Sequence, residues 1–158
     1  MFNFSLELSD NSKNTLNAFE KKLKVDFFAK IVIKELKKES NSFFNKEEDP
    51  DHIFWIPSNR VIKKGGKTLH DTGFLEESMQ KNETYIIEGN SILVKPNVFY
   101  AKFNQFGTKN KNGSIRNPRR RFSGLTNESK EHLKNIAKNY SVGFSNLWFI
   151  LHLKITTE

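Results

Sequence analysis

Alternating hydrophobic and polar positions predict strands at both ends of the chain and in its middle. Residues 2–8 alternate with a period of two, which indicates a strand with one buried face. Residues 147–155 alternate in the same way. In the middle, residues 85–88 and 91–95 flank Gly89-Asn90, a pair typical of a two-residue hairpin turn. The pattern therefore predicts a small, mostly antiparallel sheet.

Hydrophobic residues at helical spacing predict helices between these strands. Such spacing runs through residues 16–38, although the pattern leaves open a break near Lys24. Residues 74–80 fit a short helix, which Asp71 or Thr72 is expected to cap.

A last helix is expected to begin at Thr126, with an acidic first turn and with Leu133 and Ile136 on its inner face. Together these elements indicate an α+β protein in which N-terminal and C-terminal helices pack on one side of the sheet. A chain of 158 residues fits a single domain, here residues 1–158.

Two segments show no period. Residues 40–70 are rich in Asn, Ser, Asp and Pro, so we expect a packed or functional loop there. Residues 107–118 contain two glycines and several polar residues, so we expect a long, flexible basic loop. We also expect this loop to be disordered in the isolated subunit and to become ordered on docking.

The excess of positive charge belongs to one segment. The net charge is +8, and no acidic residue occurs between Glu88 and Glu128. This acid-free segment holds eight basic residues, and without them the chain has 18 basic and 18 acidic residues. The eight are Lys95, Lys102, Lys109, Lys111, Arg116, Arg119, Arg120 and Arg121. We therefore expect one surface to meet a polyanion or an acidic partner.

Arginine is concentrated in the same segment, because four of the five arginines lie within residues 116–121. The planar guanidinium grips phosphates and carboxylates with two hydrogen bonds, which lysine does not. The pattern leaves open whether this loop binds nucleic acid, another protein or its own chain. One alternative is a nucleic-acid-binding domain that uses the basic loop of residues 109–121. Fifteen phenylalanines, however, are more typical of a core or a subunit interface than of base stacking.

Several kinds of chemistry find no support. The chain has no cysteine, residues 147–151 are too short an apolar run to span a bilayer, and residues 1–10 do not fit a signal peptide, so we expect function without Sec export. Residues 65–68 (GGKT) lack the upstream glycine of a phosphate-binding loop, and the four histidines lack zinc-site spacing. A hydrolase that uses Asp71 is the weakest alternative. We expect no catalytic residue, no metal and no cofactor.

Four segments, taken in order, resemble one family. They are residues 55–57 (WIP), 67–78 (KTLHDTGFLEES), 100–108 (YAKFNQFGT) and 118–125 (PRRRFSGL). Their order and spacing are similar to the phage virion morphogenesis family, the tail completion proteins of Mu-like and related contractile-tailed phages. The structural positions of this pattern are Trp55, Pro57, Asp71, Gly73, Leu75, Tyr100, Ala101, Gln105, Gly107, Pro118 and Gly124.

The chain departs from the family pattern at a few positions. In the family, the last segment runs Pro-Ala-Arg-Pro-Phe-Leu-Gly, so Arg119 and Arg121 replace Ala and Pro here. Asn104 stands where a histidine is usual. The terminal strand within residues 144–155 has no assigned counterpart in that pattern.

The resemblance implies a structural protein of the virion that is not an enzyme. It implies assembly in the host cytoplasm and a position at the head-proximal end of the tail, where the protein completes the tail and joins it to the head. The implied partners are further copies of the chain in a ring, the tail tube or terminator proteins and the head connector. DNA passes only as cargo, and no membrane is involved.

The resemblance also suggests roles for the basic loop. The residues expected to face another subunit, a partner or DNA are Lys109, Lys111, Arg116, Arg119, Arg120, Arg121 and Phe122. Phe122 would anchor the segment, and Gly124 would allow a tight turn. Arg120 would fix subunit geometry by pairing with a carboxylate, while Arg119 and Arg121 would face the channel or a docking partner.

Overall fold

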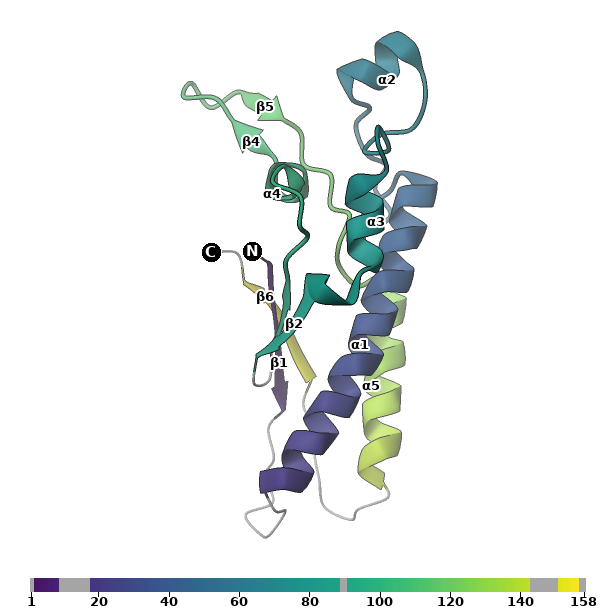
Figure 1. Ribbon diagram of the computed structural model, residues 1–158, viewed down its shortest axis with the longest axis vertical. Coiled ribbons are helices and arrows are strands. Elements are labelled where there is room, and N and C mark those ends of the chain that lie inside the picture. Colours follow the sequence, from purple (N-terminus) through teal and green to yellow (C-terminus); the bar gives the residue numbers. More distant parts are fainter. Residues whose placement is uncertain (1, 9–17, 89–90, 143–150, 157–158) are drawn as a thin grey trace. The chain divides into compact units, whose positions relative to one another are not determined.

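The computed structural model describes the backbone of residues 2–8, 18–88, 91–142 and 151–156 and the side chains of residues 26–88 and 91–138 (Figure 1). The chain divides into two compact units, each described by itself. Unit 1 comprises Met1–Glu35, Tyr85–Lys95 and Glu128–Glu158, and unit 2 comprises Leu36–Thr84 and Pro96–Asn127. The single domain over residues 1–158 stays a prediction.

Unit 1 contains a four-stranded antiparallel sheet in the order β2-β3-β1-β6. Its strands are β1 (Phe2–Leu8), β2 (Tyr85–Glu88), β3 (Ser91–Val94) and β6 (Leu151–Thr156). The two chain ends pair with each other, since Leu8 lies opposite Leu151 and Asn3 opposite Thr156. The predicted strands are therefore confirmed, whereas Gly89-Asn90 and residues 147–150 lie outside the described residues.

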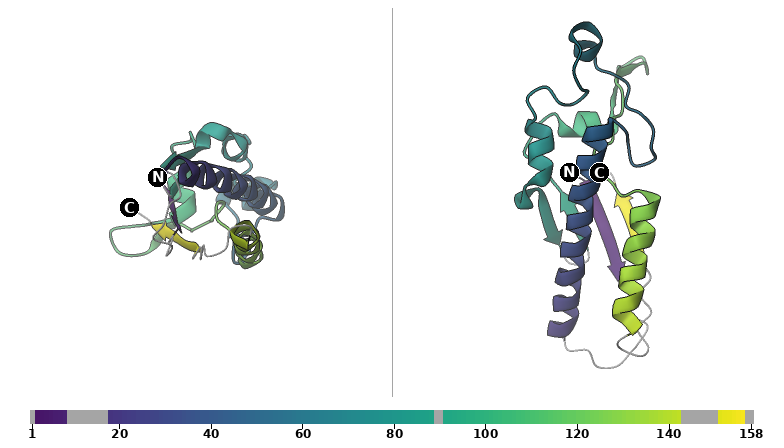
Figure 2. Two further views of the ribbon diagram at one scale, coloured as in Figure 1. Left: turned by 90° about the horizontal axis from the view of Figure 1, so that it is seen from below. Right: turned by 90° about the vertical axis from the view of Figure 1, so that its right-hand side faces the viewer.

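Two helices lie on one side of this sheet, as predicted (Figures 1 and 2). They are the first part of α1 (Ala18–Lys46) and α5 (Asn127–Val142). Helix α1 continues without a break through Lys24. Val32 of α1 and Leu133 of α5 are fully buried, and Ile136 is half-buried. The Ser129 hydroxyl donates a hydrogen bond of 2.9 Å to Glu35, which ties the two helices together.

Unit 2 is built on the second part of α1 and carries the segments that resemble the family pattern. Its elements are α2 (Asn59–Lys64), α3 (Phe74–Gln80), the 3₁₀ turn η1 (Asn82–Thr84), α4 (Ala101–Phe106), β4 (Thr108–Lys109) and β5 (Ile115–Asn117), with β4 and β5 forming a separate hairpin (Figure 2). The core of this unit includes Leu36, Phe43, Phe44, Trp55, Leu75, Met79, Ala101, Phe122 and Leu125. The helix predicted for residues 74–80 is confirmed.

The prediction that residues 40–46 are irregular is wrong, because α1 extends to Lys46. Ser40, Phe43 and Phe44 continue the buried face of the helix beyond Leu36. The neighbouring serines and asparagines suggested a turn and so obscured this spacing. Their weak preference for turns is outweighed by the free energy gained on burying two phenylalanines. Most of residues 47–70 is irregular, as expected, apart from α2.

The predicted cap of α3 is also wrong. Neither Asp71 nor Thr72 occupies the N-cap position, which belongs to Gly73 in the left-handed conformation, with φ of 75° and no side-chain cap. A glycine adopts this conformation without the steric cost that a Cβ imposes. Asp71 instead lies on the surface, with its carboxylate 3.3 Å from Nε of Arg60.

The expected irregular loop of residues 107–118 contains the hairpin of β4 and β5. Its turn is closed by hydrogen bonds from Asn110 N to Ser114 O (2.8 Å) and from Gly113 N to Asn110 O (2.9 Å). Strands of two and three residues are too short to show a period of two, so the sequence pattern missed them. The expectation that this loop becomes ordered on docking stays a prediction.

Candidate interface around the basic segment

Arg120 is an internal brace of unit 2. The residue is only 4% exposed. Its Nε donates to the Ile56 carbonyl oxygen at 2.7 Å, and its Nη1 donates to Oδ1 of Asn117 at 3.1 Å. Its backbone N–H donates to the Asn104 carbonyl oxygen at 2.7 Å. Burial lowers the pKa of the guanidinium from its ordinary value. The partners of Arg120 in the subunit are therefore amide oxygens, and not the carboxylate that we expected.

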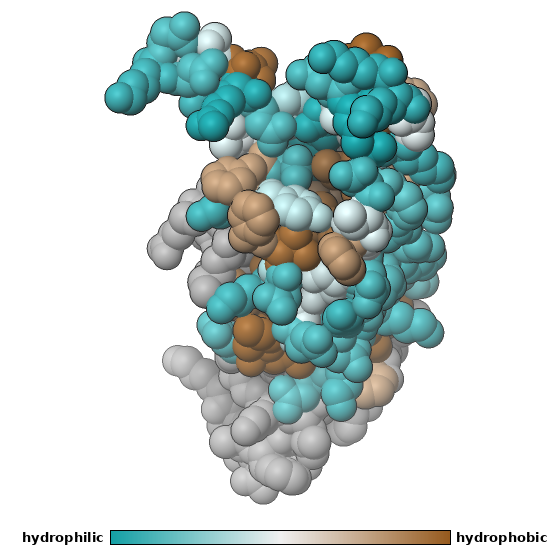
Figure 3. Space-filling model, turned by 45° about the horizontal axis from the view of Figure 1, so that its top comes forward, coloured by the Kyte–Doolittle hydropathy of each residue, from teal (hydrophilic) through white to brown (hydrophobic). Residues whose placement is uncertain are grey.

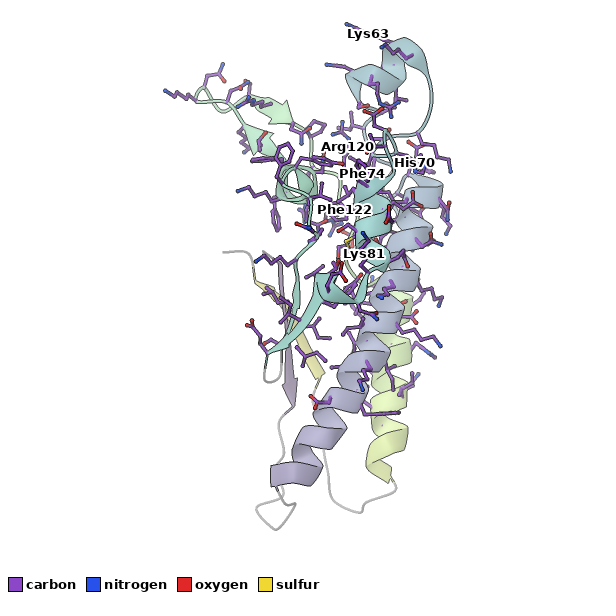
Figure 4. All side chains as sticks on the ribbon, in the orientation of Figure 1. Lys63, His70, Phe74, Lys81, Arg120 and Phe122 are labelled. Carbon is purple, nitrogen blue, oxygen red and sulfur yellow. The ribbon has the colours of Figure 1, made fainter. Side chains whose placement is uncertain are left out.

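Aromatic packing anchors the residues that follow. Phe122 is fully buried, and its ring centroid lies 5.9 Å from that of Phe44. Trp55 packs edge-on against Phe44, with centroids 5.6 Å apart, and its indole Nε1 donates to the Arg121 carbonyl oxygen at 3.1 Å. Such aromatic pairs stabilise a fold by about 0.5–1.5 kcal/mol beyond the area that they bury. Phe122 thus anchors the segment, as the family resemblance suggested (Figure 4).

Gln105 of α4 holds the backbone of the same segment. Its Oε1 accepts hydrogen bonds from the N–H groups of Phe122 (3.1 Å) and Ser123 (3.3 Å), and its Nε2 donates to the Ser123 carbonyl oxygen at 2.9 Å. The Ser40 hydroxyl donates to the Phe122 carbonyl oxygen at 2.9 Å. At the next position, a Cβ on Gly124 would lie 2.6 Å from Cγ of Pro50, so only glycine fits without displacing Pro50. Buried backbone groups are thus satisfied without any sheet.

Arg121 forms the carboxylate pairing that was expected of its neighbour. Its Nη2 lies 2.7 Å from Oδ2 of Asp49 and also contacts Oδ2 of Asp51. The side chains of Arg121 and Asp49 are 18% and 13% exposed, so water screens this pair little. Arg121 therefore ties the basic segment to the acidic loop that follows α1.

The groups around Asp49 shift the pKa of its carboxylate. Burial by itself raises its pKa, but hydrogen bonds from Arg121 and from the N–H groups of Ile53 and Asp51 outweigh that effect, so the pKa lies below its ordinary value. Sequence reasoning missed this partner. The signal was two aspartates in a loop close to Trp55, which is itself part of the family pattern.

The hairpin presents the remaining cations to solvent. Lys109, Lys111 and Arg116 are exposed, as is Arg119 just beyond it. Among the described residues, none of these four has an ion-pair partner. The structure thus divides the seven predicted site residues, since four cations point outward while Arg120, Arg121 and Phe122 lie within the subunit.

The base of the hairpin is tightly packed against α4. The Asn117 side-chain amide donates to the Phe103 carbonyl oxygen at 2.7 Å. Gly107 ends α4 with φ of 71°, and a Cβ there would lie 2.9 Å from the Asn117 carbonyl oxygen and 3.0 Å from the Arg119 nitrogen. Only glycine fits this approach without displacing backbone.

The other positions of the family pattern divide between core and surface. Leu75, Ala101, Trp55 and Gln105 are buried, Tyr100, Gly73, Gly107 and Pro118 are half-buried, and Pro57 and Asp71 are exposed. The aromatic residues divide too, since Phe43, Phe44 and Phe122 are in the core whereas Phe54 and Phe103 are 74% and 41% exposed. The buried members hold the fold, and the exposed ones are available to a partner.

The described residues contain no cluster of three or more side chains suited to hold a metal ion. His70, for example, lies with its Nδ1 2.6 Å from a carboxylate oxygen of Glu76. None of the helices in the described part of the chain is long and apolar enough to cross a bilayer.

Comparison with known proteins identifies the family. The phage virion morphogenesis family matches residues 13–141, which include all four segments of the sequence pattern. No curated protein and no solved structure matches the chain. Because the family match covers most of the 158 residues, the chain belongs to the phage virion morphogenesis family of structural tail proteins, which are not enzymes.

Proposed function

We propose that this protein acts at the head-proximal end of a phage or prophage tail, where a ring of identical subunits completes the tail and joins it to the head. Its partners are other copies of the chain, the tail tube or terminator protein and the head connector. DNA passes through the ring as cargo. Family membership supports the tail assignment, and the surface of unit 2 supports the assembly role.

The observation that carries the assembly role is the number of hydrophobic side chains on that surface. Eight large hydrophobic side chains are between 41% and 85% exposed. They are Ile53, Phe54, Ile56, Ile62, Phe74, Phe99, Phe103 and Ile115. Single exposed hydrophobic residues are ordinary, but a large cluster beside charged residues is typical of a surface that another protein covers. In Figure 3, hydrophobic side chains gather between the hydrophilic projections of the hairpin and of α2.

The test is complementation in a lysogen that lacks the gene. Without the protein, induced cells are expected to contain filled heads and separate tails. Supplying the chain from a plasmid should restore joined particles, and an antibody against the chain should label the junction. Normal, infectious particles in the deletion strain would contradict the proposal.

The alternative, a nucleic-acid-binding domain, draws on the four exposed cations around the hairpin. It makes a different prediction, since the purified protein would then bind free duplex tightly at physiological salt. A protein that surrounds passing DNA is expected to bind it weakly, with a dissociation constant on the order of 10⁻⁴–10⁻⁶ M. A gel shift over a salt series separates the two functions.

A further inference from the structure

A hollow in unit 2 lies beside α3. It has a volume of about 320 Å³ and is open to solvent. Its apolar side is formed by Phe74 of α3 and by Val98 and Phe99, which precede α4. Phe74 and Phe99 are 63% and 85% exposed, so two aromatic rings stand at the rim of the hollow without a cover in the subunit.

Hydrogen bonds connect the segments that line the hollow. Ser78 and Thr84 are buried there. The Ser78 hydroxyl accepts a hydrogen bond from Asn97 N at 3.1 Å, and the Ser78 carbonyl oxygen accepts one from the Thr84 hydroxyl at 2.5 Å. These bonds join α3, η1 and the segment before α4, so the hollow is preformed and an occupant need not first order it.

The polar side of the hollow is acidic. Glu77 and Glu83 contribute two carboxylates, and Lys81, which lies 3.2 Å from Glu77, contributes one cation. Figure 4 labels Phe74 and Lys81 at the two ends of α3. An occupant that complements this surface needs one exposed apolar side chain and an excess of positive charge.

The hairpin of β4 and β5 has these properties. Ile115 is 67% exposed, and the same hairpin carries three exposed cations, Lys109, Lys111 and Arg116. No acidic residue occurs in the whole segment between Glu88 and Glu128. The turn and the base of the hairpin are held by hydrogen bonds. Figure 1 shows the hairpin extending away from α3, and it shares no residue with the hollow.

We infer that the hairpin of one subunit docks into the hollow beside α3 of a second copy of this chain. In the proposed ring this contact is head-to-tail, with each hairpin in the hollow of the next subunit, and its repetition closes the ring when the rotation fits. Ile115 would lie among Phe74, Val98 and Phe99, while the hairpin cations face Glu77 and Glu83. This inference rests on the proposed function, to which it adds the contact that joins the subunits.

Charge reversal tests the contact. One variant carries Lys109→Glu, Lys111→Glu and Arg116→Glu on the hairpin, and a second carries Glu77→Lys and Glu83→Lys at the hollow. The matched control carries Lys30→Glu and Lys34→Glu on α1 in unit 1, outside both surfaces. All these residues are exposed, so the variants are expected to keep the circular dichroism spectrum of the wild type.

Sedimentation velocity and native mass spectrometry over a concentration series report the assembly. The wild type and the control are expected to form oligomers larger than dimers. Each charge-reversed variant by itself should raise the dissociation constant by roughly 100-fold or more, because like charges then face each other. Mixing the two variants, or combining them in one chain, restores opposite charges and should restore the oligomers. Ile115→Asn should weaken assembly, and neither set of charge reversals should rescue it.

Three results would overturn the inference. The first is a wild type that stays monomeric throughout the concentration series, and the second is a charge-reversed variant that assembles like the control or is not rescued by its counterpart. The third is a hairpin variant that assembles normally but loses duplex binding, which would make the hairpin a DNA surface. The complementation test distinguishes failure of this contact from failure of the proposed function. If a hairpin variant assembles normally and still restores joined particles, the proposed function stands and this contact is excluded.

Discussion

Three consecutive arginines have three different environments. Arg119 is exposed, Arg120 is buried against the Ile56 carbonyl and the Asn117 side chain, and Arg121 pairs with Asp49. The guanidinium has five donors in a rigid fork, which lets Arg120 bond two oxygens in different directions while remaining charged. The sequence suggests one basic surface patch here. In the structure, however, Arg120 and Arg121 bond to other segments of unit 2, and only Arg119 is exposed.

Replacing Arg120 with lysine should lower the free energy of unfolding by about 1–3 kcal/mol, because a single ammonium cannot reproduce bonds in both directions. Arg119→Lys is the matched control and should change it by no more than about 0.5 kcal/mol. Urea unfolding followed by tryptophan fluorescence measures both. Equal stability of the two variants would show that the bonds of Arg120 contribute nothing.

The lowered pKa of Asp49 predicts a dependence of stability on pH. A carboxylate whose pKa is lower in the folded state contributes stability above its unfolded pKa of about 4, and the contribution is lost as the pH falls through the folded value. The stability difference between the wild type and Asp49→Asn should therefore be largest near pH 7 and should shrink between about pH 5 and pH 2. Urea titrations at several pH values check this, and a constant difference would argue against the pairing.

At the scale of elements, the base of the hairpin is where local geometry is most restrictive. Gly107 combines a positive φ with backbone atoms at 2.9 and 3.0 Å from any added Cβ. Gly113 in the turn also has a positive φ, of 82°, but has open space around it. Substitutions at these two positions therefore distinguish the free-energy cost of a positive φ from the cost of steric crowding around an added Cβ.

Gly113→Ala is expected to destabilise the protein by about 1 kcal/mol, since only the conformation is unfavourable. Gly107→Ala adds a backbone collision, so its cost should be larger by roughly 1–2 kcal/mol. Thermal or urea unfolding compares the two, and amide hydrogen exchange should show that the excess cost falls on residues 108–117. Equal costs would mean that the hairpin base can shift freely.

On the scale of the whole molecule, the net charge of +8 overstates the positive charge that is exposed to a polyanion. Two of the eight cations in the acid-free segment are engaged within unit 2, Arg120 with amide oxygens and Arg121 with carboxylates. The other six are exposed. Four of them lie around the hairpin, namely Lys109, Lys111, Arg116 and Arg119, and the other two are Lys95 and Lys102.

If duplex DNA contacts this surface, log affinity should fall with log salt with a slope of at most about 4, since each phosphate contact contributes about 0.9. Lys111→Ala should reduce that slope by roughly 1, whereas Lys63→Ala on α2 should leave it unchanged. Fluorescence anisotropy over a salt series gives the slopes. A slope well above 4 would mean that cations outside the hairpin region also bind DNA.

Much of this protein follows from the sequence by itself. Period-two alternation determined β1 and β6 near the two ends of the chain, helical spacing determined α3 and most of α1 and α5, and the order of four short segments determined the family. These features are local, or depend only on order along the chain, so each can be read without knowing which distant residues touch. Where the spacing was hidden by polar residues, as at Ser40 to Lys46, or where strands were two or three residues long, the prediction failed.

Only the tertiary structure decided which partner each arginine of the basic segment bonds to. Asp49 and Arg121 are 72 residues apart, and Ile56 and Arg120 are 64 apart, so no local pattern could show that one arginine pairs with a carboxylate and its neighbour with a carbonyl. The hollow beside α3 likewise joins residues 74–84 with residues 97–100. Burial and charge pairing depend on which side chains meet in space, and that is set by the packing of the whole unit rather than by the order of its residues.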